Sequence, residues 1–216
     1  MTRPAAVLFD CDGVLVDSEP ATFALLGEEL AAHGLPLDPH EMEALFIGGT
    51  IEGVAQTARG MGASLPEDWV ETYYTRLYAR LAGNAPLIDG IPELLDALDA
   101  AGIGYAVGSN GRQAKMQATL GQHPGIIARL RGRLFSGQEL GCPKPDPGLY
   151  LYAAHALGAD PAHCVVIEDS PTGARAARAA GMRCLGYAPQ CAHPRLAAEG
   201  AELFASMRAV PGLLGL

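Results

Sequence analysis

Short, continuous apolar runs alternate with helical patterns along most of the chain. The runs predict strands over residues 5–9, 103–107, 133–135, 164–167 and 182–185. Apolar residues recur at helical spacing over residues 91–101, 112–120, 147–157 and 171–180. Continuous rather than alternating apolar runs are typical of strands that are buried on both faces, as in a parallel sheet. The pattern therefore predicts an α/β fold with a Rossmann-like, doubly wound parallel sheet.

The segment between residues 17 and 86 departs from this alternation, because it shows helical periodicity and no strand pattern. Helices are predicted over residues 21–32, 39–46, 51–61 and 67–81. We therefore expect a sheet-containing core of residues 1–16 and 87–216, interrupted by an all-helical domain of residues 17–86. The insert carries a net charge of −8 and the rest of the chain −1. Solvated helix faces alone would explain this difference.

Composition narrows the classes of partner and compartment. A net charge of −9 over 216 residues argues against nucleic acid or an anionic membrane surface as the main partner. No apolar run approaches the length of a membrane span, and the first apolar run is too short for a signal peptide. The five cysteines lack CxxC spacing, so we expect reduced thiols in a cytoplasmic protein. Nothing in the sequence requires more than a monomer.

Two carboxylates close the first predicted strand, in the stretch VLFDCDGVLVDSE. Asp10 and Asp12 are two residues apart, so in extended backbone both point to the same side. Ligands of doubly wound sheets bind beyond the carboxyl ends of the strands. Two close carboxylates repel each other unless a cation is present, and an all-oxygen site suits Mg²⁺. Gly13 would permit a tight turn there. A simple turn or a helix cap is the alternative.

A second acidic pair follows the predicted strand at residues 164–167. Glu168 and Asp169 precede Ser170, a favourable N-cap residue, and Pro171, which suits the first helical position. The pair therefore lies where a strand turns into a helix. Four carboxylates at one sheet edge indicate a metal site.

Two further segments offer groups that suit a phosphate. Ser109 and Asn110 lie in a glycine-containing turn between a strand and a helix, an arrangement typical of anion binding, although an ordinary turn has the same composition. Lys144 stands between two prolines and is one of only two lysines in the chain. A lysine in such a stiff loop would place a fixed positive charge among the carboxylates.

These segments, in this order, resemble the four motifs of the haloacid dehalogenase superfamily. The matching stretches are FDCDGVLVDSE, GSNG, KPDP and IEDSPTG. The helical insert resembles the small helical cap of the phosphoglycolate phosphatase and β-phosphoglucomutase-like members. Residues 109–116 and 134–137 are most similar to bacterial 6-phosphogluconate phosphatases.

The resemblance implies a covalent mechanism with Mg²⁺ as cofactor. Asp10 would attack phosphorus and form an aspartyl-phosphate, while Asp12 would act as general acid and then as general base. The metal would be held by Asp10, the backbone carbonyl of Asp12 and Asp169, and Glu168 would contact a water on the metal.

The same resemblance implies the contacts to the substrate. Ser109, Asn110 and Lys144 would hold the phosphoryl oxygens. Glu19 and the loop residues Gly48, Gly49 and Thr50 would line the substrate side of the cap. A plain helix–helix connection is the alternative for this loop.

Several members of the superfamily fit poorly. Dehalogenases lack the second Asp of the first motif, which is present here as Asp12. Phosphonate-cleaving members need a lysine in the cap, and residues 17–86 contain no lysine. A β-phosphoglucomutase-type mutase needs a basic cap loop, and residues 46–52 have no basic residue. We therefore expect a phosphatase acting on a sugar, sugar-acid or polyol monophosphate. The alternatives are a phosphosugar mutase and, from another class, a non-hydrolysing phosphoryl-binding regulator.

Overall fold

The computed structural model of the protein describes residues 3–46 and 50–216. The chain forms two compact units: Met1–Asp17 with Pro86–Leu216, called the sheet unit below, and Ser18–Ala85, called the helical unit. Within the described ranges, no helix combines the length and the apolar character that a membrane crossing requires.

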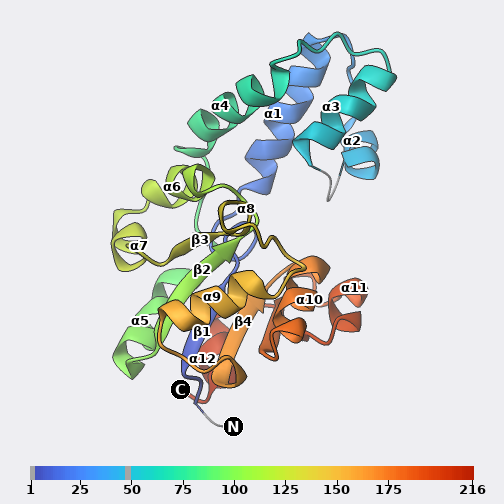
Figure 1. Ribbon diagram of the computed structural model, residues 1–216. Coiled ribbons are helices and arrows are strands. Elements are labelled where there is room, and N and C mark those ends of the chain that lie inside the picture. Colours follow the sequence, from blue (N-terminus) through green and yellow to red (C-terminus); the bar gives the residue numbers. More distant parts are fainter. Residues whose placement is uncertain (1–2, 47–49) are drawn as a thin grey trace. The chain divides into compact units, whose positions relative to one another are not determined.

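The sheet unit contains a six-stranded parallel sheet with the order β3-β2-β1-β4-β5-β6 (Figure 1). The strands are β1 (Ala6–Phe9), β2 (Gly104–Ser109), β3 (Leu134–Ser136), β4 (Cys164–Glu168), β5 (Arg183–Tyr187) and β6 (Glu202–Phe204). The predicted α/β, doubly wound parallel fold is confirmed, and the five predicted strands form. The sequence missed β6, because this strand has three residues and two of them are exposed.

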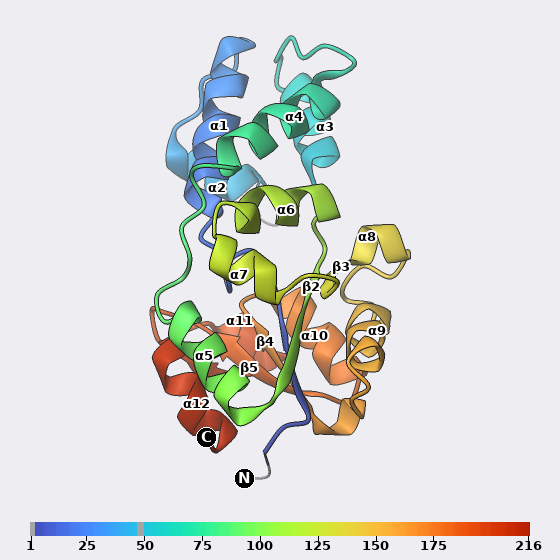
Figure 2. The same cartoon turned by 90° about the vertical axis from the view of Figure 1, so that its left-hand side faces the viewer.

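Helices flank the sheet on both sides. They are α5 (Ile91–Ala101), α6 (Gln113–Gly121), α7 (Pro124–Arg129), α8 (Gly137–Leu140), α9 (Gly148–Ala156), α10 (Pro171–Ala179), α11 (Pro194–Ala198) and α12 (Val210–Leu214), with 3-10 turns η1 (Pro161–His163) and η2 (Met207–Ala209). Helices α9 and α10 lie on one side of the sheet, and α5 and α12 on the other (Figure 2). The four predicted core helices correspond to α5, α6, α9 and α10. The remaining ones have six residues or fewer, too few for a helical period to show.

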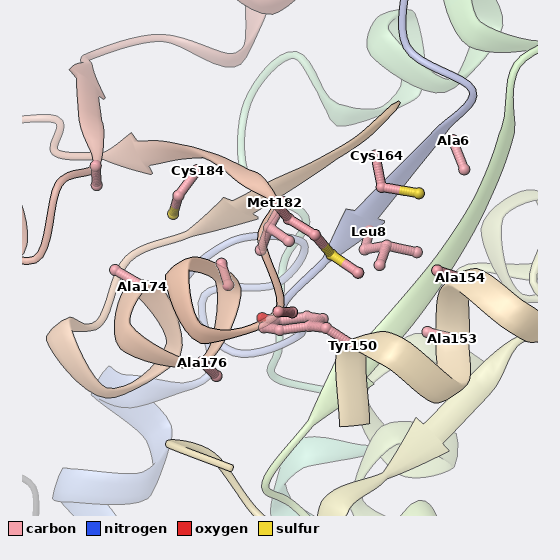
Figure 3. Packing of buried hydrophobic residues seen from close by; sticks show 14 of the residues in the cluster. Ala6, Leu8, Tyr150, Ala153, Ala154, Cys164, Ala174, Ala176, Met182 and Cys184 are labelled. Atoms are coloured by element: carbon pink, nitrogen blue, oxygen red, sulfur yellow. The ribbon is translucent and has the colours of Figure 1, made fainter. Parts of the chain in front are cut away.

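Burial on both faces of the sheet explains the continuous apolar runs. All four residues of β1 are fully buried. On one face, Ala6 and Leu8 pack with Tyr150 and Ala153 of α9 and with the alanines of α10 (Figure 3). Small residues on α10 let the helix approach the sheet closely, and this fixes the strand ends that carry the polar motifs.

The helical unit consists of α1 (Glu19–Ala32), α2 (Pro39–Phe46), α3 (Ile51–Gly60) and α4 (Trp69–Leu81). Its core includes Trp69 and Tyr73 of α4, whose rings stack with centroids 5.2 Å apart. The Tyr73 hydroxyl donates to the backbone oxygen of Thr22 in α1 at 3.2 Å. In the described residues of this segment, 18–46 and 50–85, the four helices and the absence of a strand match the expected helical pattern.

The two points where the chain passes between the units are joined within the sheet unit. The backbone N–H of Asp17 donates to the carbonyl of Pro86 at 2.9 Å, and Val16 forms a β-bridge with Leu87. This pairing ties Asp17 and Pro86 to the sheet unit, and both residues belong to it.

Candidate active site

Three motif residues lie at the carboxyl ends of neighbouring strands. Asp10 directly follows β1, Ser109 is the last residue of β2, and Glu168 is the last residue of β4. Since β1 pairs with β2 on one side and β4 on the other, all in parallel, these residues reach the same sheet edge. The sheet topology therefore brings together segments about 100 and 160 residues apart in the sequence.

Lys144 lies between α8 and α9 and forms ion pairs with both Asp10 and Glu168. Its Nζ atom is 2.5 Å from Asp10 Oδ1 and 2.6 Å from Glu168 Oε1, and its side chain is only 3% exposed. The ammonium also lies 4.9 Å from the centre of the Tyr150 ring. Burial works to raise the pKa of Glu168, but the Lys144 cation and the hydrogen bonds from Lys144, Tyr150 and Ser170 together outweigh it and hold that pKa below its usual value.

Glu168 is the most completely bonded side chain of the cluster. It accepts hydrogen bonds from five donors: Lys144 Nζ, the Tyr150 hydroxyl, the backbone N–H groups of Asp169 and Ser170, and the Ser170 hydroxyl. An ionised carboxylate offers about four acceptor positions, so these donors use its capacity fully. Glu168 thus acts as an anchor for Lys144 and for the start of α10.

Gly173, in the first turn of α10, leaves the space that this carboxylate occupies. A Cβ atom at that position would overlap the Glu168 carboxylate. Ser170 caps the same helix, accepting from the Gly173 N–H at 3.0 Å, as its sequence position predicted.

Three carboxylates can share a cation at this edge. Oxygens of Asp10, Glu168 and Asp169 lie within 4.8 Å of one another. Burial, opposed by Lys144 and reinforced by Glu168 and Asp12, raises the pKa of Asp10 to about 7. Oxygen ligands with this much negative charge suit Mg²⁺. Since Glu168 is fully used by its donors, Asp10 and Asp169 are the better placed ligands of the three.

Gly13 makes room for this cluster. Its φ of 78° falls in the left-handed region, and a Cβ atom there would overlap the Asp169 carboxylate. The glycine of the first motif is therefore required for two separate physical reasons.

The Asp12 carboxylate is not part of this three-carboxylate group. Its Oδ2 atom instead lies 2.9 Å from Nζ of Lys115 on α6. Both side chains are partly accessible, at 23% for Asp12 and 20% for Lys115. The two aspartates of the first motif therefore occupy different electrostatic surroundings, which suits different chemical roles.

The Ser109–Asn110 turn sits beside the lysine loop. The Asn110 side-chain amide donates to the Lys144 carbonyl at 3.1 Å, and its oxygen accepts from the Lys144 N–H at 2.7 Å. Ser109 is buried, and its hydroxyl accepts from the Gly111 N–H at 2.9 Å. Asn110 thus fixes the backbone of the lysine loop, a contact that its sequence position did not suggest.

The predicted substrate-side residues belong to the helical unit. Glu19 begins α1, and Thr50 caps α3 by accepting from the Gly53 N–H at 3.1 Å. Gly48 and Gly49 lie outside the described residues. Their predicted contact with substrate stays a prediction.

Two residues of the site were not assigned to it from the sequence. Tyr150 lies in an apolar helix segment, GLYLYAAHA, where it looks like an ordinary core residue. Lys115, in the first turn of α6, forms an ion pair with Asp12. A lysine in the first turn of the helix after the Ser109 turn was the available signal, but the direction of its side chain depends on the tertiary fold.

Comparison with known proteins identifies the family. Residues 4–181 match the family model of the haloacid dehalogenase-like hydrolases. The chain belongs to this family. The predicted resemblance is thereby confirmed, and so is the expectation of an enzyme.

Members of the haloacid dehalogenase-like family with assigned activities resemble this chain over most of its length. A 6-phosphogluconate phosphatase of Escherichia coli (strain K12) is 34% identical over 90% of this chain and 86% of its own. A phosphoglycolate phosphatase of Xanthomonas campestris is 33% identical over 84% and 82%. A crystal structure of a family hydrolase from Deinococcus radiodurans R1, with bound phosphate and sodium, is 36% identical with a TM-score of 0.81, over 100% and 98% of the two chains. Family and relatives together support a phosphatase.

Proposed function

We propose that the protein is a Mg²⁺-dependent phosphatase that hydrolyses a small phosphorylated sugar, sugar acid or polyol through an aspartyl-phosphate. The observation that carries this proposal is the separation of the two aspartates of the first motif. Asp10 is buried against Lys144 and belongs to the group of three carboxylates, whereas Asp12 is partly accessible and paired with Lys115. A nucleophile and an acid–base group need different surroundings of this kind.

In the first half-reaction, a carboxylate oxygen of Asp10 bonds to phosphorus as the bond from phosphorus to the leaving oxygen breaks. Asp12 gives its proton to that leaving oxygen, so the product departs as a neutral alcohol. In the second, Asp12 takes a proton from water, and the water oxygen bonds to phosphorus. The bond between phosphorus and Asp10 then breaks, releasing inorganic phosphate and restoring the Asp10 carboxylate.

The remaining residues hold charge and position. Asp10 and Asp169 would bind Mg²⁺ together with the Asp12 backbone carbonyl, and the bound ion would offset the crowded negative charge of carboxylates and phosphate. Lys144, which is held by Glu168, would direct its ammonium to the phosphoryl group. Ser109 would donate its hydroxyl to a phosphoryl oxygen, and Asn110 supports the lysine loop.

Charge in the helical unit favours a phosphatase over a mutase. A mutase must bind a bisphosphate and so needs a second cationic site. The three arginines of the helical unit all bond within that unit: Arg76 with Glu29, Arg80 with Glu28, and Arg59 with the carbonyls of Leu65 and Pro66.

We further propose that this unit serves as a cap over the substrate, and that the chain segments at Asp17 and Pro86 are the hinges of its movement. Small-angle scattering with and without a phosphate analogue tests that closure.

The test of the proposed function is turnover of p-nitrophenyl phosphate with Mg²⁺ and with EDTA, in wild type and Asp10→Asn. Wild type should need Mg²⁺, and the variant should lose at least about a thousandfold in rate while still folding and unfolding cooperatively. Normal turnover by the variant would remove Asp10 from the nucleophile role. A panel containing 6-phosphogluconate, 2-phosphoglycolate and neutral sugar phosphates would then rank the substrates.

A further inference from the structure

Lys115 is the second cation of the site, and the proposed chemistry does not use it. It lies on α6 with Nζ 2.9 Å from Asp12 Oδ2, the carboxylate that serves the leaving group in the proposed function. This ion pair favours the charged form of the Lys115 ammonium.

The two lysines of the chain differ in how many carboxylates their ammonium groups contact. Lys144 is held by Asp10 and Glu168 and is almost completely buried. Among the described residues, Asp12 is the single ion-pair partner of Lys115, whose side chain is 20% exposed. An ammonium carries three N–H donors, so Lys115 can hold Asp12 and still donate to a ligand.

A negatively charged leaving group needs a cationic side chain to bind it, and the helical unit has few cations that could serve. Segment 17–86 carries a net charge of −8. Its arginines are engaged by Glu29, Glu28 and backbone carbonyls within the same unit. A cation for the non-reacting end of a substrate must therefore come from the sheet unit, where Lys115 stands next to the acid–base carboxylate.

We propose that Lys115 is a specificity-determining residue that binds a carboxylate on the leaving group, so that sugar-acid phosphates are preferred over neutral sugar phosphates. The inference rests on the proposed function, because that function places the leaving oxygen at Asp12. One ammonium, already shared with Asp12, matches a single negative charge. It would be insufficient for the double charge of a second phosphate.

The test compares 6-phosphogluconate with sorbitol 6-phosphate, which differ only in whether the first carbon is a carboxylate or an alcohol. Wild type should favour the acid by at least about tenfold in kcat/KM. Lys115→Met should lower this preference at least about tenfold, mainly by raising KM for the acid. Lys115→Arg, which keeps the charge, should retain the preference within about threefold. Ratios are used because both variants alter the contact to Asp12.

Several outcomes would overturn the inference. Equal losses on both substrates would leave Lys115 with a role toward Asp12 alone. Arg112, the residue that precedes α6, is the control position. A loss of preference in Arg112→Met as large as in Lys115→Met would point to general charge rather than to this side chain. A wild type that hydrolyses sorbitol 6-phosphate or p-nitrophenyl phosphate but does not prefer the acid would sink the inference and leave the proposed function standing. Hydrolysis of none of the three would sink both.

Folding of the variants is checked by their unfolding transitions, and Lys115→Gln replaces Lys115→Met if the latter does not fold. A measurement on wild type alone gives a second decision. Gluconate should inhibit p-nitrophenyl phosphate hydrolysis at least about tenfold more strongly than sorbitol does. Equal inhibition by the two compounds would contradict carboxylate binding at Lys115.

Discussion

The Lys144–Glu168 pair of the candidate site and the Arg80–Glu28 pair of the helical unit differ in burial and in the number of hydrogen bonds that each carboxylate receives. At the site, Lys144 and Glu168 are 3% and 0% exposed, and Glu168 accepts five hydrogen bonds. In the helical unit, Arg80 and Glu28 are 35% and 58% exposed and bond chiefly to each other.

This difference indicates that the buried pair serves the chemistry of the site and that the exposed pair belongs to the solvated surface. Removing a charge pair from water carries a desolvation penalty that often exceeds the attraction between the charges, so a buried pair is weak evidence of stabilisation. The exposed pairs carry little penalty and contribute little. The Lys144–Glu168 network is therefore best understood as the support of a reactive group, Asp10, and the Arg80–Glu28 pair as a feature of a solvated surface.

The largest effect is expected for Lys144→Met. The substitution leaves Asp10 and Glu168 close together in a buried site without their shared cation, which should lower the free energy of unfolding by about 3–5 kcal/mol. Turnover should fall at least about a thousandfold. Urea unfolding in EDTA and initial rates in Mg²⁺ measure the two effects. An unchanged unfolding midpoint would erase the contrast between the two regions.

Next comes the pH dependence of Asp10. Its pKa is raised to about 7 in the folded protein, against roughly 4 in an unfolded chain. The folded state therefore binds this proton more tightly, and the associated stability is lost as pH rises from about 4 through 7. Above pH 7 the ionised group destabilises the metal-free protein by up to about 4 kcal/mol.

Asp10→Asn lacks this titration, so in EDTA it should become progressively more stable than wild type between pH 5 and pH 8. Thermal unfolding of both proteins across that range checks the trend. A constant difference would show that the folded pKa of Asp10 is not raised. Mg²⁺ should reduce the difference, because the bound ion favours the ionised carboxylate.

A smaller effect is expected for Tyr150→Phe, which removes one donor from Glu168 and leaves the ring beneath Lys144. Loss of one hydrogen bond to a buried carboxylate should lower stability by about 1–3 kcal/mol and turnover by about tenfold. Tyr105→Phe is the matched control. Its hydroxyl donates to Asp99 at 3.0 Å, a residue half exposed and away from the site. Equal losses of turnover in the two variants would contradict a supporting role for Tyr150.

The smallest effect is expected for Arg80→Ala in the helical unit. Because the Arg80–Glu28 pair is solvated and screened by salt, the unfolding midpoint should stay within the error of the measurement. A clear loss of stability that disappears in high salt would show that pairs in this unit matter more than their exposure indicates.

The parts of the site that could be predicted from the sequence are those fixed by strand ends. Asp10 and Glu168 follow continuous apolar runs, and parallel pairing of β1 with β4 requires them to meet. Lys144 stood out because a lysine between prolines is unusual in a chain with two lysines.

The parts that could not be predicted depend on directions set by helix packing. The Tyr150 hydroxyl belongs to a helix whose other inward residues are apolar, so only the packed structure reveals its bond to Glu168. The direction of Lys115 toward Asp12 depends on how α6 lies over the strand ends. Of the four carboxylates expected at this edge, Asp10, Glu168 and Asp169 have oxygens within 4.8 Å of one another, and Asp12 forms an ion pair with Lys115.

Gly173 sets a condition on chains that look like this one. The carboxylate above it is held by five donors and cannot swing aside for even a methyl group without breaking several of them. A paralogue that retained each acidic and basic motif residue but carried alanine at the position of Gly173 would be expected to be catalytically impaired. Checking that single glycine separates functional copies from degenerate ones where the motifs themselves do not.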